Sequence, residues 1–291
     1  MIRHSVKTND GRTVNVGEGG DRRGRPVFAL HGTPSSLILY PPHLADASKK
    51  RIRLISFDRA GYGRSSPGPG RKVADASDDV AAIADSLGLE RFAVWGISGG
   101  GPHALACAAL LPKRVVAAAS LALPAPFPAR GLDWFAGQGQ DNVEEFEAAL
   151  AGQENLERYL GSQRAQLLKA TPEEIIQLWD RILPRMDKVA LLGELGPFLA
   201  SNMKSALRRG YAGWRDDDLS FVSDWGFDLS DISVPILLWQ GRHDRMVPYE
   251  HGRWLARQLK GAEVRLMPDD GHLTLFERHI PETHAWLLKH F

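Results

Sequence analysis

The chain has 291 residues, 43% of them hydrophobic, and it carries 36 basic residues against 35 acidic ones. A chain of this length and apolar content can bury one large core, or a core together with an inserted subdomain. The near balance of charge excludes a protein whose main task is to bind nucleic acid or an anionic membrane through a basic surface.

The cysteine content and the hydropathy of the chain predict the cellular compartment of the protein. Cys107 is the only cysteine, so no internal disulfide can form, and we expect a reducing compartment. The first residues show no apolar core of signal-peptide length, and no stretch reaches the roughly 18 apolar residues that a membrane-spanning helix needs. These features predict a cytoplasmic protein without a membrane partner.

Residues 1–124 alternate between predicted strands and helices. Asp10-Gly11 lies between two β-prone runs and predicts a hairpin turn. Apolar runs that predict buried strands occur at 26–32, 53–63, 91–96 and 115–124. Helices are predicted at 78–88, where the apolar residues recur at helical spacing before Gly88, and at 101–112. This alternation favours a parallel sheet with crossover helices.

The pattern changes at the proline-rich stretch "PAPFPARG", and strand signals are absent until about residue 232. The segment between is predicted to be mainly helical. Thr171, Pro172 and Glu174 have the spacing of an N-cap, a first helical residue and a capping box. Four of the eight tryptophans fall here, so the segment has apolar faces to bury.

Strands and helices alternate again at the C-terminal end, with strands within 234–244 and 263–272 and helices at 250–259 and 281–291. The fold class is therefore α/β, with a mostly parallel central sheet and helices on both faces. We expect a core formed by residues 1–124 and 232–291, interrupted by a helical insertion at 125–231.

Ser98 lies in the glycine-rich stretch "GISGGG" at 96–101, between a predicted strand and a predicted helix. A dinucleotide-binding loop does not fit, because Ser98 stands where the second glycine of G-x-G-x-x-G belongs. A P-loop does not fit, because Pro102 and His103 follow the last glycine in place of lysine and Ser/Thr. A plain tight turn remains as an alternative.

A nucleophile elbow is the reading that fits the context of Ser98. Residues 96–100 have the form G-x-S-x-G, and they follow a strand and precede a helix, as the elbow requires. The turn is so sharp that only small residues fit two positions either side of the serine, and Gly96 and Gly100 meet that need. The helix after the turn directs its N-terminus at the serine, which favours negative charge there.

A serine nucleophile needs a base, and the base needs an acid to orient it. In a parallel sheet these partners follow later strands, at the carboxyl ends. Asp244 and His272 each follow a predicted strand, in the chain order that this architecture uses. Asp269 and Asp270 stand too close to His272 to reach its far ring nitrogen. His103 is the competing histidine and is expected to pack or to line the site.

The chain resembles the α/β-hydrolase superfamily, in its serine hydrolase and esterase branch with an HG-x-P loop. The similar motifs are "LHGTP" at 30–34, "FDRAGYGRS" at 57–65, "GISGGG" at 96–101, "GRHDRMVP" at 241–248 and "GHLTLFE" at 271–277. The resemblance implies that the insertion at 125–231 is a helical cap over the active site. It also implies a cis peptide bond at Thr33-Pro34.

Two backbone N–H groups are expected to form the oxyanion hole, that of Gly99 after the nucleophile and that of Thr33, since Pro34 has none. Haloalkane dehalogenases and epoxide hydrolases resemble the chain near the HG-x-P loop but use aspartate at the elbow, so Ser98 indicates acyl transfer instead. No metal-ligand spacing such as H-E-x-x-H occurs, and we expect neither metal nor organic cofactor.

These observations predict a serine hydrolase that cleaves a carboxylic ester or lactone of a small molecule through an acyl-enzyme. The same three residues could also serve a carbon–carbon bond hydrolase or a perhydrolase. The alternative from another class is a receptor that binds a small molecule on this fold with slow or no turnover. Aromatic residues of the insertion, Phe127, Phe135 and Phe198 among them, suggest an apolar pocket.

Overall fold

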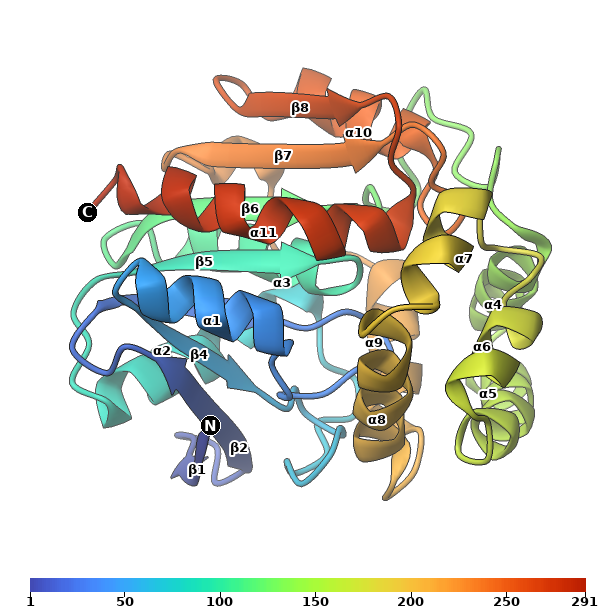
Figure 1. The fold of residues 1–291 in the computed structure, drawn as a ribbon, viewed down its shortest axis with the longest axis horizontal. Coiled ribbons are helices and arrows are strands. Elements are labelled where there is room, and N and C mark those ends of the chain that lie inside the picture. The colour runs from blue at the N-terminus through green and yellow to red at the C-terminus, as the bar shows by residue number, and fades with distance from the viewer.

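A computed structural model describes the whole chain, residues 1–291. One sheet holds eight strands in the order β1-β2-β4-β3-β5-β6-β7-β8 (Figure 1). The strands are β1 (Ile2–Lys7), β2 (Thr13–Gly20), β3 (Arg25–Leu30), β4 (Ile52–Phe57), β5 (Phe92–Ile97), β6 (Val115–Leu121), β7 (Ile236–Gly241) and β8 (Glu263–Met267). Only β1 and β2 run antiparallel to their neighbours, and the other pairs are parallel. The prediction of a mostly parallel sheet is confirmed.

Eleven α-helices accompany the sheet. They are α1 (Pro41–Lys49), α2 (Ala76–Ser86), α3 (Gly100–Leu110), α4 (Gln140–Leu150), α5 (Gln153–Leu167), α6 (Pro172–Leu178), α7 (Arg185–Leu191), α8 (Leu195–Leu207), α9 (Ala212–Phe221), α10 (Tyr249–Gln258) and α11 (His272–Leu288). The capping box predicted at Thr171 and Glu174 is present at the start of α6. Helix α1 was not among the predicted elements.

The last helix begins earlier than the sequence predicts. We expected it at 281–291, whereas α11 begins at His272 and carries Pro281 inside it. Leu275 and Ile280, before and beside the proline, pack in the same buried cluster as Trp286. Burial of this continuous apolar face against the sheet outweighs the local tendency of proline to start or break a helix.

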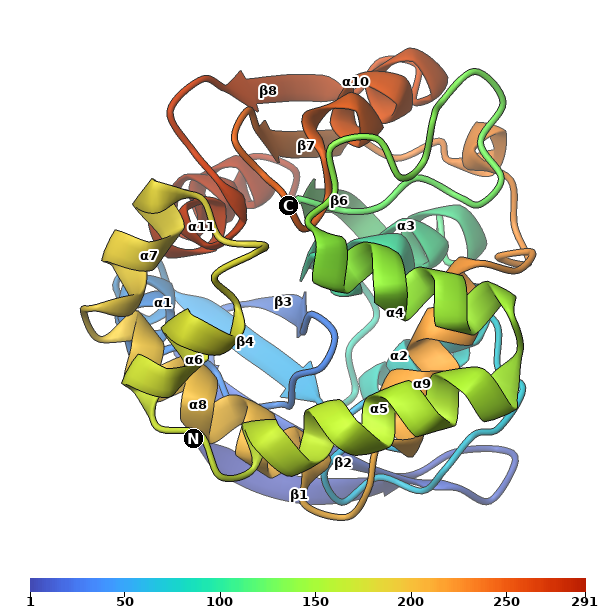
Figure 2. The same ribbon diagram turned by 90° about the vertical axis from the view of Figure 1, so that its right-hand side faces the viewer.

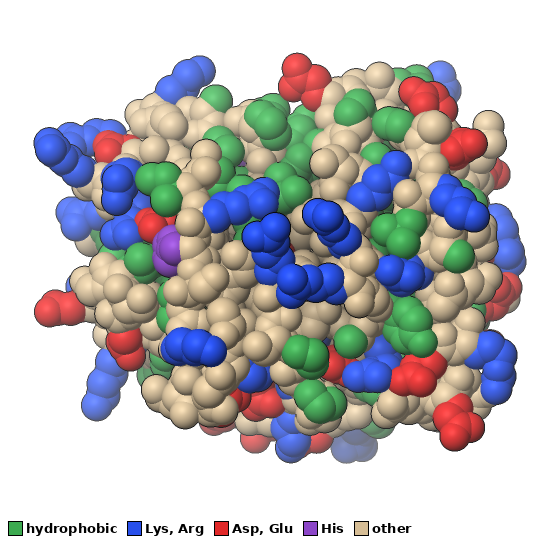
Figure 3. All heavy atoms as spheres, turned by 90° about the horizontal axis from the view of Figure 1, so that it is seen from below, with side chains coloured by type: hydrophobic (Ala, Val, Ile, Leu, Met, Phe, Trp, Pro, Cys, Tyr) green, Lys and Arg blue, Asp and Glu red, His purple; other side chains and the backbone are tan.

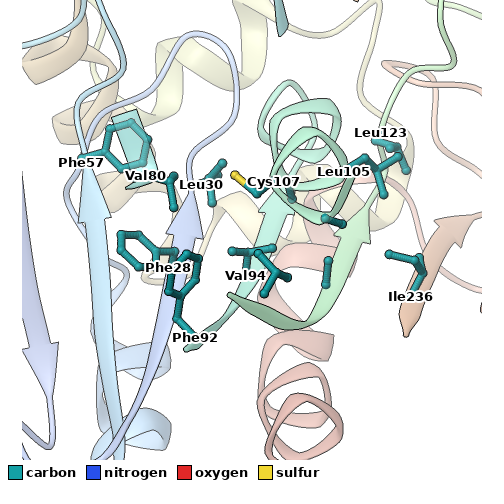
Figure 4. Packing of buried hydrophobic residues seen from close by; sticks show 14 of the residues in the cluster. Phe28, Leu30, Phe57, Val80, Phe92, Val94, Leu105, Cys107, Leu123 and Ile236 are labelled. Carbon is teal, nitrogen blue, oxygen red and sulfur yellow. The ribbon is translucent and has the colours of Figure 1, made fainter. Parts of the chain in front are cut away.

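Two hydrophobic layers hold the helices on the sheet. On one face α2, α3 and α10 pack against the strands, and on the other face α1 and α11 do so (Figure 1). The first layer includes the rings of Phe28 and Phe92, whose centroids lie 4.9 Å apart, and Cys107 from α3 (Figure 4). Helices therefore cover both faces of the sheet, as predicted, and hold the strand ends in fixed positions.

Helices α4 to α9 all lie between β6 and β7 in the chain, and they gather beside the carboxyl ends of the parallel strands (Figure 2). The predicted helical segment thus begins with a long loop, because α4 starts only at Gln140. Leu156, Leu160 and Leu207 form a buried cluster within this segment. Tyr40 and Leu273, which lie outside it, join a second cluster with residues of α7 and α8.

On the face seen from below, basic, acidic and hydrophobic side chains are intermixed, with several basic groups gathered near the middle (Figure 3). None of the helices combines the length and apolar character that would be needed to span a bilayer.

Candidate active site

Ser98 occupies a strained turn between β5 and α3. Its φ is +54°, in the left-handed region that residues other than glycine seldom adopt. Its N–H donates to the carbonyl of Leu121 in β6 at 2.8 Å. A Cβ on Gly96 would collide with the backbone of Gly100, and a Cβ on Gly100 would collide with the carbonyl oxygen of Leu30. The turn therefore requires glycine at both positions that the sequence singled out.

His272 and Asp244 form a buried, hydrogen-bonded pair. His272 follows β8 and is the first residue of α11, and its Nδ1 lies 2.8 Å from Oδ2 of Asp244. Because a carboxylate faces Nδ1, that nitrogen carries the proton and Nε2 has a free lone pair. Burial lowers the pKa of His272, but the charge of Asp244, its hydrogen bond and the charge of Asp187 outweigh burial, so the pKa is raised.

The carboxylate of Asp244 is fixed from both sides. Its Oδ1 accepts the backbone N–H groups of Met246 at 2.9 Å and Val247 at 2.8 Å. Its Oδ2, besides facing His272, accepts the side-chain amide of Gln240 at 3.3 Å. These hydrogen bonds hold Asp244 so that only its Oδ2 faces the imidazole of His272. This arrangement sets the tautomer and the orientation of the imidazole ring.

Thr33 and Gly99 come together beside Ser98. The Thr33-Pro34 peptide bond is cis, as the resemblance implied. A Cβ on Gly99 would collide with the Thr33 hydroxyl, and a Cβ on Gly32 would lie 3.4 Å from the Cβ of Ser98. Neither the Thr33 N–H nor the Gly99 N–H donates a backbone hydrogen bond. Both amide groups can therefore bind an oxygen atom of a ligand.

Asp217, on α9, ties the helical segment to the loop of Thr33. One of its oxygens accepts the Thr33 hydroxyl at 2.5 Å and the Tyr62 hydroxyl at 2.8 Å, and it pairs with the Arg59 guanidinium at 2.5 Å. Its other oxygen pairs with Arg71 at 2.7 Å. Burial raises the pKa of Asp217, but the charges of Arg59 and Arg71 outweigh burial and hold the pKa well below its ordinary range.

Two histidines near this network have structural partners. His103 contacts Asp217 at 3.3 Å and the Val73 carbonyl at 3.1 Å, and burial lowers its pKa to about 4. His31 bonds the Gly32 carbonyl at 2.8 Å and accepts the backbone N–H of Arg59. The competing histidine of the sequence analysis, His103, is therefore engaged away from Ser98.

Asp187, on α7, holds the start of α11. Its side chain is fully buried and accepts the backbone N–H of His272 at 2.7 Å and that of Thr274 at 2.9 Å. It also accepts the Thr274 hydroxyl at 3.1 Å. A carboxylate that binds the free N–H groups at a helix N-terminus satisfies them and is stabilised by the helix dipole.

No sequence motif singled out Asp187 or Asp217. Both lie in the helical segment, which no motif covers. The run of three consecutive aspartates, Asp216-Asp217-Asp218, was the one signal that could have drawn attention to Asp217. For Asp187 the local sequence carries no signal, since its partners are on a helix 85 positions away.

A cavity of about 480 Å³ opens above Ser98 and His272. Thr33 and Gly99 line it near the serine, and 22 of its 45 lining residues are hydrophobic, so the wall is mixed rather than apolar. Phe198 lines it as expected, whereas Phe127 and Phe135 pack against Trp134 instead. No group of three or more His, Cys, Asp or Glu side chains is arranged to hold a metal ion.

Comparison with known proteins gives consistent similarities. Residues 25–279 match a family model described as alpha/beta hydrolase fold. An AB hydrolase superfamily protein of Bacillus subtilis is 28% identical over 280 residues, covering 94% of either chain. A bifunctional esterase/perhydrolase of Acinetobacter calcoaceticus is 24% identical over 270 residues, 92% of either chain. The structure of a thermophilic esterase from Thermogutta terrifontis superposes with a TM-score of 0.72 at 21% identity, covering all of both chains.

Proposed function

This chain belongs to the alpha/beta hydrolase fold family, and we propose that it is a serine hydrolase of carboxylic esters or lactones that uses Ser98, His272 and Asp244. One observation carries the proposal. Ser98, which is strained at φ +54°, and His272 line the same cavity. His272 is hydrogen-bonded to the buried carboxylate of Asp244. Two of the similar proteins are named as esterases, which supports a carboxylic ester as the substrate class.

The proposed reaction assigns one role to each of these groups. Nε2 of His272 takes the proton of the Ser98 hydroxyl as its oxygen attacks the substrate carbonyl. The N–H groups of Gly99 and Thr33 bind the oxyanion of the tetrahedral intermediate. His272 then gives the proton to the leaving alcohol, and the acyl group stays on Ser98. A water molecule, deprotonated by His272, releases the acid and restores the serine.

The cavity bounds the substrate to a small or medium-sized molecule. Its volume of about 480 Å³ is within the usual range of small-molecule sites. The lining of the helical segment, including Trp179 and Phe198, adds apolar contact for an acyl chain or an alcohol group.

The test is hydrolysis of p-nitrophenyl esters of increasing acyl length by the wild type and by Ser98→Ala. We expect turnover by the wild type and a loss of about 10⁴-fold or more in the variant, whose unfolding temperature stays unchanged. Ser223→Ala, at an exposed position just after α9, is the control and keeps full activity. Equal turnover without Ser98 would contradict the proposal. Saturable ligand binding by a folded wild type that cleaves none of the esters would favour the receptor alternative.

Perhydrolysis is a second candidate activity of the same site. Hydrogen peroxide can attack the acyl group on Ser98 in place of water, which gives a peracid and the free serine. The likeness to a protein named as a bifunctional esterase/perhydrolase favours this activity. Formation of peracid from an ester and hydrogen peroxide, measured by oxidation of iodide, tests it, and Ser98→Ala should abolish the signal.

A further inference from the structure

Three consecutive aspartates on α9 have different surroundings. Asp216 pairs with Arg215 at 2.7 Å, and Asp217 is bonded by Arg59, Arg71 and Thr33 as described. Asp218 is the one that lines the cavity. It is 1% exposed, and neither of its carboxyl oxygens has a hydrogen-bond donor.

A second carboxyl group, that of Glu145 on α4, faces Asp218. Glu145 lines the same cavity and accepts the indole N–H of Trp214 at 2.7 Å. Burial raises the pKa of both carboxyl groups, and for Asp218 the neighbouring charge of Glu145 raises it further. Each carboxyl group therefore disfavours ionisation of the other, and a positive charge in the cavity would favour their ionised forms.

No cation of the protein neutralises this pair directly. Arg71, whose charge reaches Asp218, is bonded to Asp217, and Arg181 is bonded to Asp141 at 2.8 Å. The two carboxyl oxygens of Asp218 are buried without a hydrogen-bond donor, which is unfavourable when this carboxyl group is charged. A ligand that supplies both positive charge and hydrogen-bond donors would satisfy it.

Aromatic rings that line the same cavity suit the same ligand. Trp214 is held by Glu145, and Trp134 and Phe146, with ring centroids 4.8 Å apart, line the cavity as well. Faces of aromatic rings attract ammonium groups, and a carboxylate next to such faces adds hydrogen bonds.

The pair lines the same cavity as the nucleophile, and α9 connects the two positions. Asp218 precedes Phe221 by about one helical turn, so the two side chains share a face of α9. The tip of the Phe221 ring lies 3.0 Å from the place that a Cβ on Gly99 would occupy. A molecule that extends from the Thr33 and Gly99 amides along α9 therefore reaches Asp218 and Glu145.

From this geometry we propose that Asp218 and Glu145 form a subsite for a primary ammonium group, so that the preferred ester carries such a group remote from its scissile carbonyl. The choice of an ester rests on the function proposed above. The subsite itself is a binding site and does not depend on turnover.

Binding is measured first, by calorimetry on Ser98→Ala with hexylammonium chloride and with 1-hexanol. A charge-assisted hydrogen bond corresponds to about tenfold or more in affinity, so the ammonium should bind at least tenfold more tightly than the alcohol. Asp218→Asn and Glu145→Gln keep the shape of the pair and should each remove most of this preference. Glu144→Gln alters the neighbouring, outward-facing carboxylate of α4 and should leave the preference intact.

Kinetics with matched esters then extends the test to turnover. Wild type should show a kcat/KM at least tenfold higher for p-nitrophenyl 6-aminohexanoate than for p-nitrophenyl heptanoate, and Asp218→Asn should make the two about equal. Equal affinity for hexylammonium and hexanol in the folded protein would overturn the subsite, whether or not heptanoate is cleaved. Tight ammonium binding without cleavage of any ester would overturn the hydrolase proposal and leave the subsite standing. Variants that lower the unfolding temperature without changing the preference would show a purely structural pair and overturn the subsite.

Discussion

The carboxylate of Asp187 accepts the backbone N–H of His272 at 2.7 Å, so a residue of the helical segment fixes the first turn of the helix that carries the proposed base. Through this bond the position of the imidazole depends on α7 as well as on the sheet. Asp187 does not line the cavity, and its expected role is positioning.

We expect Asp187→Asn to lower kcat by about tenfold, equivalent to about 1.4 kcal/mol, with a smaller effect on KM. The variant removes a negative charge that raises the pKa of His272, so the acidic limb of the pH–rate profile should move to lower pH. Stopped-flow or steady-state rates across pH check both effects. Asp180→Asn, which alters an exposed carboxylate of the same segment, should change neither, and a profile that stays in place in Asp187→Asn would refute the positioning role.

The pH dependence of the wild type follows from the raised pKa of His272. Only the neutral imidazole can accept the serine proton, so kcat/KM should rise with pH through a pKa above the ordinary value of 6.5. Asp244→Asn removes the charge that opposes burial and should shift this limb to lower pH while kcat falls by about 10⁴-fold. A limb that keeps its position in Asp244→Asn would show that another group controls it.

The network around Asp217 predicts a large effect on stability. Asp217→Asn leaves the buried guanidinium groups of Arg59 and Arg71 without a counter-charge, and it should lower the free energy of unfolding by about 3–5 kcal/mol. Urea denaturation measures this quantity. Asp224→Asn breaks only the exposed ion pair with Lys72 and should leave the free energy of unfolding nearly unchanged. Similar losses of unfolding free energy in the two variants would contradict the stabilising role of the Asp217 network.

Two glycines should respond to alanine in opposite ways. In Gly99→Ala the new Cβ collides with the Thr33 hydroxyl, which displaces the proposed oxyanion donors, and kcat should fall by about 10²- to 10³-fold. Gly161 lies inside α5, and a Cβ there meets only Tyr211 at an ordinary 3.9 Å. Gly161→Ala should raise the free energy of unfolding by about 0.5–1 kcal/mol without changing activity. Thermal unfolding and ester turnover, measured for both variants, test these two expectations.

Local patterns in the sequence were sufficient to predict the central sheet and the turn at Ser98. The alternation of apolar runs with helical spacing predicts parallel strands because each element must bury one face against the next. The elbow at 96–100 could be predicted from the G-x-S-x-G pattern, and at Gly96 the cause is local, because a Cβ there would collide with the backbone of Gly100 four residues on. The clash that requires glycine at position 100 comes from Leu30, which only the tertiary structure brings there. The sequence also brought Asp244 and His272 into consideration, and the structure bonds them to each other.

Tertiary contacts decided what local patterns could not. Helix α11 begins at His272 rather than near Pro281 because its apolar face packs on the sheet and Asp187 binds its first N–H groups. The division of the chain at 124/125 and 231/232 and the catalytic roles of the site residues remain predictions.

The sequence by itself determined the α/β architecture and a serine in a glycine turn, because periodicity and backbone sterics are short-range. Only the tertiary structure brought Asp187 to His272, Asp217 to Thr33 and Glu145 to Asp218. Such pairings depend on how the helical segment folds back over the strand ends, and no local pattern encodes a bond between residues 184 positions apart.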